Sequence, residues 1–76
     1  MYKITEEFSK MVKKYRTRYY KEILGLNYAY MSTILNGSRN CSEIVAKGII
    51  SIYFGIPLAH EKIPLLLNKY FIKTKE

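Results

Sequence analysis

The chain has 76 residues, of which 49% are hydrophobic and 25% are charged, and its formal net charge is +7. This length supports one domain with a small core, and the composition is too apolar for intrinsic disorder. One cysteine, Cys41, and one histidine, His60, exclude an intramolecular disulfide framework and leave no Cys/His zinc set.

The first half of the chain predicts two helices. The first covers about Thr5 to Tyr15, with Thr5 as its cap. Its apolar side chains recur at the spacing of one helical face: Phe8, Met11, Val12 and Tyr15. A second, shorter helix is predicted from about Thr17 to Leu24 and ends at Gly25, since glycine tolerates positive φ.

A third helix is predicted from about Tyr28 to Asn36. Asn27 is a favourable N-cap, and Gly37 stops the helix. Its buried face comprises Met31, Ile34 and Leu35. The second and third elements therefore follow each other as helix, short turn and helix, which is the outline of a helix-turn-helix.

The second half predicts a fourth helix from about Cys41 or Ser42 to Phe54. Its cap is either Asn40, with Glu43 completing a capping box, or Ser42. Pro57 can begin a helical turn that continues through residues 58–62. A final helix is predicted to about Phe71, and a strand beginning near Lys69 is the alternative. The apolar tail either closes over the core or forms a subunit interface.

Together these elements predict an all-α fold, a compact bundle of about five short helices in a single domain over residues 1–76. The core of the domain is expected over about residues 5–56. Residues 57–76 would form a C-terminal helix or a dimerisation tail, and a homodimer is expected because so short a chain builds only a marginal core.

Residues 24–40 resemble the Cro/repressor-type helix-turn-helix family (the XRE family), in particular its small phage or mobile-element members. The positions that match its pattern are Gly25, Leu26, Asn27, Met31, Ser32, Ile34, Asn36, Gly37 and Arg39. The resemblance covers about residues 5–56. The sequence departs from the family at Tyr20 and Lys21, where members often have Leu-Ala.

The resemblance implies a lambda-repressor-like DNA-binding domain whose third helix enters the major groove. The implied base contacts are Tyr28, Ala29, Tyr30 and Thr33. The implied phosphate contacts are Arg18, Ser38, Arg39 and Asn40, with Lys14, Arg16 and Lys21 adding attraction. The expected dimer interface comprises Leu66, Leu67, Tyr70 and Phe71.

The basic charge fits this function, because seven of the thirteen Lys and Arg residues lie before position 22 and such a cluster attracts polyanions. The leading prediction is a cytoplasmic, sequence-specific transcriptional regulator that binds double-stranded DNA. The uncharged, largely apolar run over residues 48–59 is too short to span a bilayer, so no membrane partner is expected.

The alternative is a small inhibitor or repressor antagonist that uses the same fold to bind a host or phage protein. It is favoured by eight tyrosines, which are common at protein interfaces, and by the absence of Lys and Arg between Tyr28 and Asn36. An enzyme is not expected, because the sequence has no Asp and no nucleophile–base set, metal cluster or phosphate loop. No cofactor is expected either.

Overall fold

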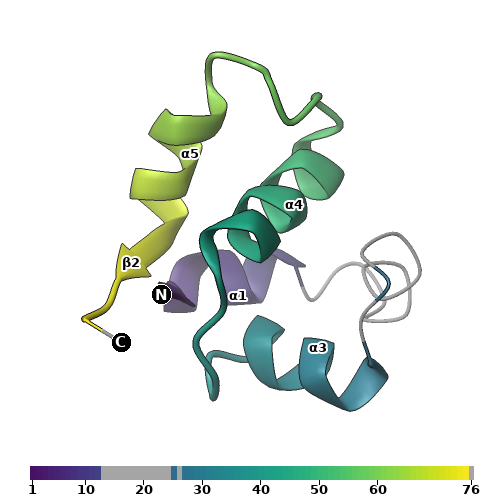
Figure 1. Ribbon diagram of the computed structural model, residues 1–76. Coiled ribbons are helices and arrows are strands. Elements are labelled where there is room, and N and C mark those ends of the chain that lie inside the picture. The colour runs from purple at the N-terminus through teal and green to yellow at the C-terminus, as the bar shows by residue number, and fades with distance from the viewer. Residues whose placement is uncertain (13–24, 26, 76) are drawn as a thin grey trace.

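The computed structural model describes residues 1–12, 25 and 27–75. In chain order, these residues form β1 (Tyr2–Ile4), α1 (Glu6–Val12), α3 (Tyr28–Leu35), α4 (Glu43–Phe54), α5 (Ile63–Tyr70) and β2 (Phe71–Lys73) (Figure 1). The helix predicted over about residues 17–24 lies outside the described residues.

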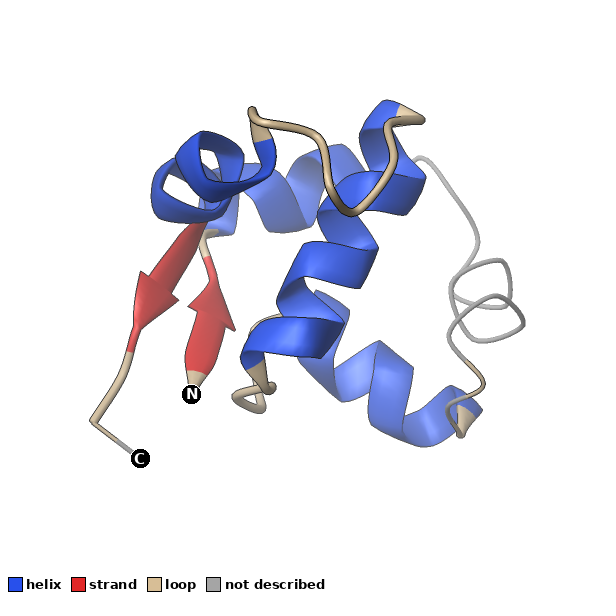
Figure 2. Cartoon of the chain, turned by 45° about the horizontal axis from the view of Figure 1, so that its top comes forward, coloured by secondary structure: helices blue, strands red, loops and turns tan. Residues whose placement is uncertain are grey.

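The prediction of an all-α bundle is wrong. The described part of the chain contains four helices and a two-stranded antiparallel sheet, so the fold is a small mixed α/β globule. The two ends of the chain form this sheet, in a register that pairs Ile4 with Phe71 and Tyr2 with Lys73 (Figure 2). Tyr2 also forms a bridge on its other side, where it and Cys41 exchange two backbone hydrogen bonds of 2.7 Å.

Both strands bring apolar side chains from the ends of the chain into the core. Tyr2 and Ile4 point into the core and Lys3 points outward, as alternation along a strand requires. At the other end Phe71 is buried and takes an extended conformation, which ends α5 at Tyr70. The sequence left a helix and a strand open as alternatives for the tail. The tail forms both, a helix that is followed directly by a strand.

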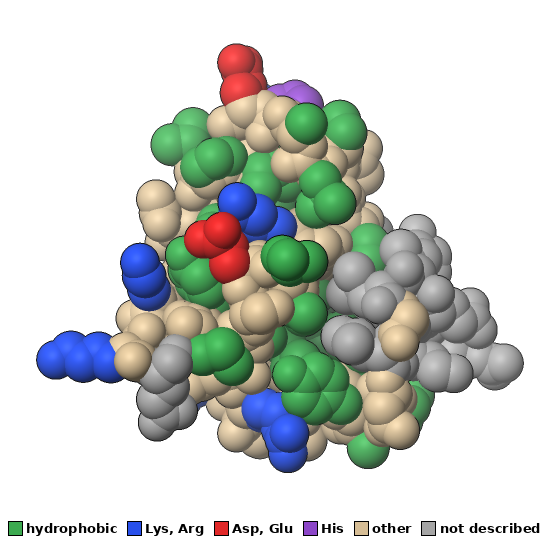
Figure 3. Space-filling model, viewed as in Figure 1, with side chains coloured by type: hydrophobic (Ala, Val, Ile, Leu, Met, Phe, Trp, Pro, Cys, Tyr) green, Lys and Arg blue, Asp and Glu red, His purple; other side chains and the backbone are tan. Residues whose placement is uncertain are grey.

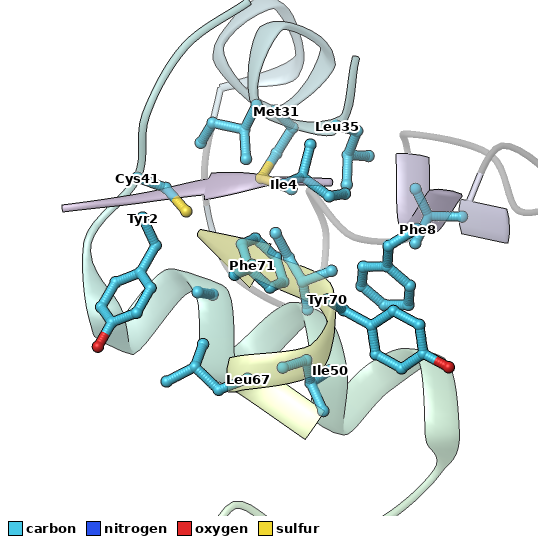
Figure 4. Close-up of a cluster of buried hydrophobic side chains, with 14 of the residues drawn as sticks. Tyr2, Ile4, Phe8, Met31, Leu35, Cys41, Ile50, Leu67, Tyr70 and Phe71 are labelled. Atoms are coloured by element: carbon cyan, nitrogen blue, oxygen red, sulfur yellow. The ribbon is translucent and has the colours of Figure 1, made fainter. Parts of the chain in front are cut away.

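An aromatic cluster around Phe8 forms the centre of the core. Phe8 is fully buried, and its ring centroid lies 4.6 Å from that of Tyr70, 5.3 Å from that of Tyr53 and 5.8 Å from that of Phe71. Figure 4 shows Phe8 beside Tyr70, with Ile4 and Leu35 on the side towards α3. The core therefore joins α1 to α4, α5 and β2.

The ends of α4 resolve one alternative that the sequence left open. The N-cap is Ser42, whose side chain accepts a hydrogen bond of 3.3 Å from the backbone of Val45. Gly55 ends the helix with a φ of 65°, the left-handed conformation that glycine adopts readily at a C-cap. Residues 57–62 form two successive turns before α5. The His60 N–H group donates to the carbonyl oxygen of Pro57, and the Ile63 N–H group donates to that of His60.

Candidate nucleic-acid interface

The first turn of α3 is exposed. The Asn27 side chain caps the helix by accepting hydrogen bonds from the backbone N–H groups of Ala29 (2.8 Å) and Tyr30 (3.3 Å). Tyr28 is 57% exposed and Ala29 is also exposed, whereas Tyr30 and Thr33 are partly buried. The opposite face, formed by Met31, Ile34 and Leu35, lies in the core. The helix therefore presents the beginning of its outer face to solvent.

The loop after α3 folds back on the end of that helix. Gly37 takes a φ of 85°, and the backbone N–H groups of Ser38 and Arg39 then both donate to the carbonyl oxygen of Thr33, at 2.9 and 3.1 Å. The Asn36 side chain accepts a further hydrogen bond of 2.9 Å from the Ser38 backbone. These bonds keep the loop, including the backbone of Arg39, against α3.

The Arg39 side chain lies over one of the predicted base-contacting residues. Its guanidinium carbon is 5.2 Å from the centroid of the Tyr30 ring, within the range of a cation–π interaction. Beside this pair is a shallow depression that also includes Ser38, Asn40 and Met1. One predicted base contact, Tyr30, thus lines the same depression as three of the predicted phosphate contacts, Ser38, Arg39 and Asn40.

The end of α3 lies against both α1 and β1. The Ser9 hydroxyl, which is buried, donates a hydrogen bond of 2.7 Å to the carbonyl oxygen of Leu35 in the last turn of α3. On the neighbouring strand β1, the Lys3 side chain reaches Gly37: a Cβ atom at Gly37 would lie 4.0 Å from Lys3 Cε. The position of α3 therefore depends on α1 and β1.

Lys3 is the basic residue that sequence reasoning left out of the site. It is exposed and lies at the end of α3 because β1 contacts that helix. The alternation of Tyr2, Lys3 and Ile4 fits an outward-facing Lys3, but three residues are too few to predict a strand from the sequence.

The described basic side chains are spread over the face that Figure 3 displays, where Lys and Arg lie at several separate places. Two lysines are paired at i,i+4 spacing, Lys10 with Glu6 at 3.6 Å and Lys47 with Glu43 at 3.4 Å. Within the described ranges, neither Arg39 nor Lys3 forms a salt bridge, so their charges remain available to an anion.

Several predicted contacts lie outside the described residues, namely Lys14, Arg16, Arg18 and Lys21. The expected dimer residues are visible, and most serve the chain's own core. Leu67, Tyr70 and Phe71 are buried and Leu66 is partly buried. The exposed apolar side chains at this end are Leu65 and Ile72. The dimer itself stays a prediction.

The two residues that could suggest other chemistry have structural surroundings. Cys41 is fully buried, and burial raises the pKa of its thiol to about 11, so the unreactive protonated form dominates near neutral pH. His60 Nδ1 accepts a hydrogen bond of 3.0 Å from the backbone of Lys62. Over the described residues no group of three or more His, Cys, Asp or Glu side chains could hold a metal ion.

Comparison with known proteins does not add an identity. We found no matching family model, no matching curated protein and no matching solved structure. In the ranges that the structure describes, no helix is both long and apolar enough to cross a membrane.

Proposed function

We propose that the protein binds double-stranded DNA and regulates transcription, with α3 lying in the major groove. The observation that carries the proposal is the exposed first turn of α3 beside the loop that holds Arg39. Tyr28 and Ala29 are solvent-facing there, and this turn contains no acidic residue, so no carboxylate on the helix would repel the DNA backbone.

The chemistry of the exposed side chains suits the edges of bases. The Tyr28 hydroxyl can donate or accept a hydrogen bond, and the Ala29 methyl group can contact the methyl group of thymine. The Thr33 hydroxyl already donates to the carbonyl oxygen of Tyr30 at 2.7 Å, which leaves its lone pairs for donors such as the amino groups of adenine and cytosine. With these three side chains, α3 would read bases without the Arg or Lys contact to guanine that is the commonest specific contact.

Phosphate binding would come from the loop and from charge. Arg39 and Ser38 are exposed next to α3, and the net charge of +7 would attract the duplex from a distance. Because such contacts displace counterions, affinity should fall steeply as salt concentration rises.

Selection of bound duplexes from a random pool, at near-physiological salt, tests the proposal. We expect enrichment of a defined site, and a palindrome if the protein binds as a dimer. Tyr28→Ala should reduce the preference for selected over random duplexes by about tenfold, whereas Arg39→Ala should weaken binding to both classes similarly.

A matched control is Leu58→Ala, because Leu58 is 58% exposed, much like Tyr28, but lies in the turn before α5. This variant should bind DNA as the wild type does. Failure to enrich any duplex, combined with retention of a protein partner from nuclease-treated host lysate, would contradict DNA binding and support the alternative of a protein-binding inhibitor.

A further inference from the structure

Tyr30 and Arg39 form one unit on the surface beside α3. The guanidinium carbon lies 5.2 Å from the Tyr30 ring centroid, and the ring itself is partly buried against the hydrophobic core. The backbone of the arginine is held as well, because its N–H group donates to the carbonyl oxygen of Thr33. Both the backbone and the charged end of Arg39 are therefore positioned relative to the helix.

The depression beside this unit offers donors and no carboxylate. The residues that line it are Met1, Tyr30, Ser38, Arg39 and Asn40. The guanidinium and the exposed Ser38 hydroxyl can donate hydrogen bonds to an anion, whereas the Asn40 side-chain amide already donates to the Thr74 hydroxyl at 3.4 Å. A phosphodiester carries one negative charge and several acceptor oxygens, and arginine pairs with phosphate through two parallel N–H groups. The depression thus has the chemistry of a site for a single phosphate.

We propose that this depression holds one phosphate of the DNA backbone, and that Tyr30 is a positioning residue for Arg39 rather than a base contact. The inference rests on the proposed function and revises the role that sequence resemblance gave to Tyr30. The Tyr30 ring lies between the core and the guanidinium, so the surface open to bases begins at Tyr28 and Ala29.

The first experiment measures affinity for a duplex selected by the wild type and for a random duplex, each from low to high salt. Arg39→Ala should weaken both by about 5- to 20-fold and lower the slope of log affinity against log salt by about one. Tyr30→Leu, which keeps an apolar contact with the core but has no ring, should weaken both by about 2- to 5-fold. In an Arg39→Ala background, Tyr30→Leu should cause no further loss.

Three further variants separate the roles. Tyr30→Phe keeps the ring and should bind as the wild type does. Tyr30→Met repeats the loss of the ring, and thermal denaturation verifies that both ringless variants are folded. Lys69→Ala is the matched control for charge and contact, because Lys69 also lies 5.2 Å from a tyrosine ring, that of Tyr70, but belongs to α5. It should leave the binding surface intact.

A second experiment locates the phosphate. The probe is a series of duplexes of the selected sequence, and each duplex has one neutral methylphosphonate in place of a different backbone phosphate. The wild type should lose affinity when a particular position on each half-site is neutral. Arg39→Ala should be insensitive to that substitution, and Tyr30→Leu should be less sensitive than the wild type.

The outcomes distinguish this inference from the proposed function. If the wild type binds no duplex, the proposed function is overturned and the inference with it. If the wild type binds DNA but Tyr30→Phe or Tyr30→Leu changes which sequence is preferred, Tyr30 contacts a base and the inference alone is wrong. An unchanged methylphosphonate profile in Arg39→Ala would likewise overturn the phosphate site.

Discussion

One lysine and one arginine side chain each lie at the same distance from a tyrosine ring, yet their surroundings differ. Lys69 lies 5.2 Å from the ring of Tyr70, which is only 7% exposed and belongs to the aromatic core. Arg39 lies 5.2 Å from the ring of Tyr30, at the edge of an exposed helix face. The first pair joins neighbours in sequence above a packed core, whereas the second holds a loop residue beside the exposed first turn of α3. The same contact therefore has a structural role in one region and suggests a functional role in the other.

This difference predicts that substitutions in the aromatic core change stability, whereas substitutions in the exposed part of α3 change binding. The largest expected effect is that of Phe8→Ala. Phe8 is fully buried among the rings of Tyr53, Tyr70 and Phe71, and its removal leaves a cavity. We expect the free energy of unfolding to fall by about 3–5 kcal/mol, measured by urea denaturation followed by circular dichroism.

Since a domain of this size is stabilised by about 4–11 kcal/mol in all, Phe8→Ala should be partly unfolded at 37 °C. Phe8→Leu keeps more volume and should lose less stability. Tyr28→Ala is the counterpart on the exposed helix and should change stability by about 0.5 kcal/mol or less. Similar losses for Phe8→Ala and Tyr28→Ala would contradict the division into a core and a binding surface.

The sequence predicted local features of the fold well. Helical spacing placed Phe8 and Val12 on the buried face of α1, and the Asn27 cap and Gly37 bracketed α3 correctly. Strand β1 was missed, and β2 was predicted only as an alternative to a helix. Each strand has three residues, too few for alternation to be distinctive, and their pairing joins the two ends of the chain. Such pairing depends on contacts across the whole fold, which local spacing does not report.

The candidate site was predictable to a similar extent. The exposure of Tyr28 and Ala29 follows from their positions opposite the buried face of α3. The role of Tyr30 does not, because it depends on a loop that folds back to place Arg39 over the ring. Lys3 was missed because β1 was missed, since Lys3 lies at the end of α3 through the contact of β1 with that helix.

An intermediate effect is expected at the junction between the two regions, for Ser9→Ala. Ser9 is buried in α1, and its hydroxyl donates a hydrogen bond of 2.7 Å to the carbonyl oxygen of Leu35 at the end of α3. Without this bond a buried carbonyl oxygen lacks its donor, so we expect a loss of about 1–2 kcal/mol in the free energy of unfolding. Urea denaturation measures it.

Ser38→Ala is the control for Ser9→Ala, because Ser38 is exposed and its hydroxyl is not needed to satisfy the core. Its stability should stay within about 0.5 kcal/mol of the wild type. If Ser9→Ala were as stable as Ser38→Ala, the Ser9 hydroxyl would not be the link that holds α3 to α1.

The smallest expected effect concerns pH and the link between β1 and α4. The Tyr2 hydroxyl donates a hydrogen bond of 3.1 Å to Glu43, and this bond, together with Lys47, lowers the pKa of the Glu43 carboxyl. A carboxyl whose pKa is lower in the folded state adds stability above its unfolded pKa of about 4.3. That contribution is lost as pH falls through the folded pKa.

The measurement is the difference in Tm between the wild type and Glu43→Gln from pH 7 to pH 3. Because Glu43 is exposed, we expect the wild type to be more stable by only about 1–3 °C at pH 7, with the difference narrowing as pH falls below about 4.3 and through the lowered folded pKa. Subtracting the two curves cancels the titration of the remaining glutamates.

Glu61→Gln is the control, since Glu61 forms no salt bridge with any described residue, and it should give no such pH-dependent difference. A difference between wild type and Glu43→Gln that persists at pH 3 would show that the side chain acts through packing at the sheet rather than through its charge.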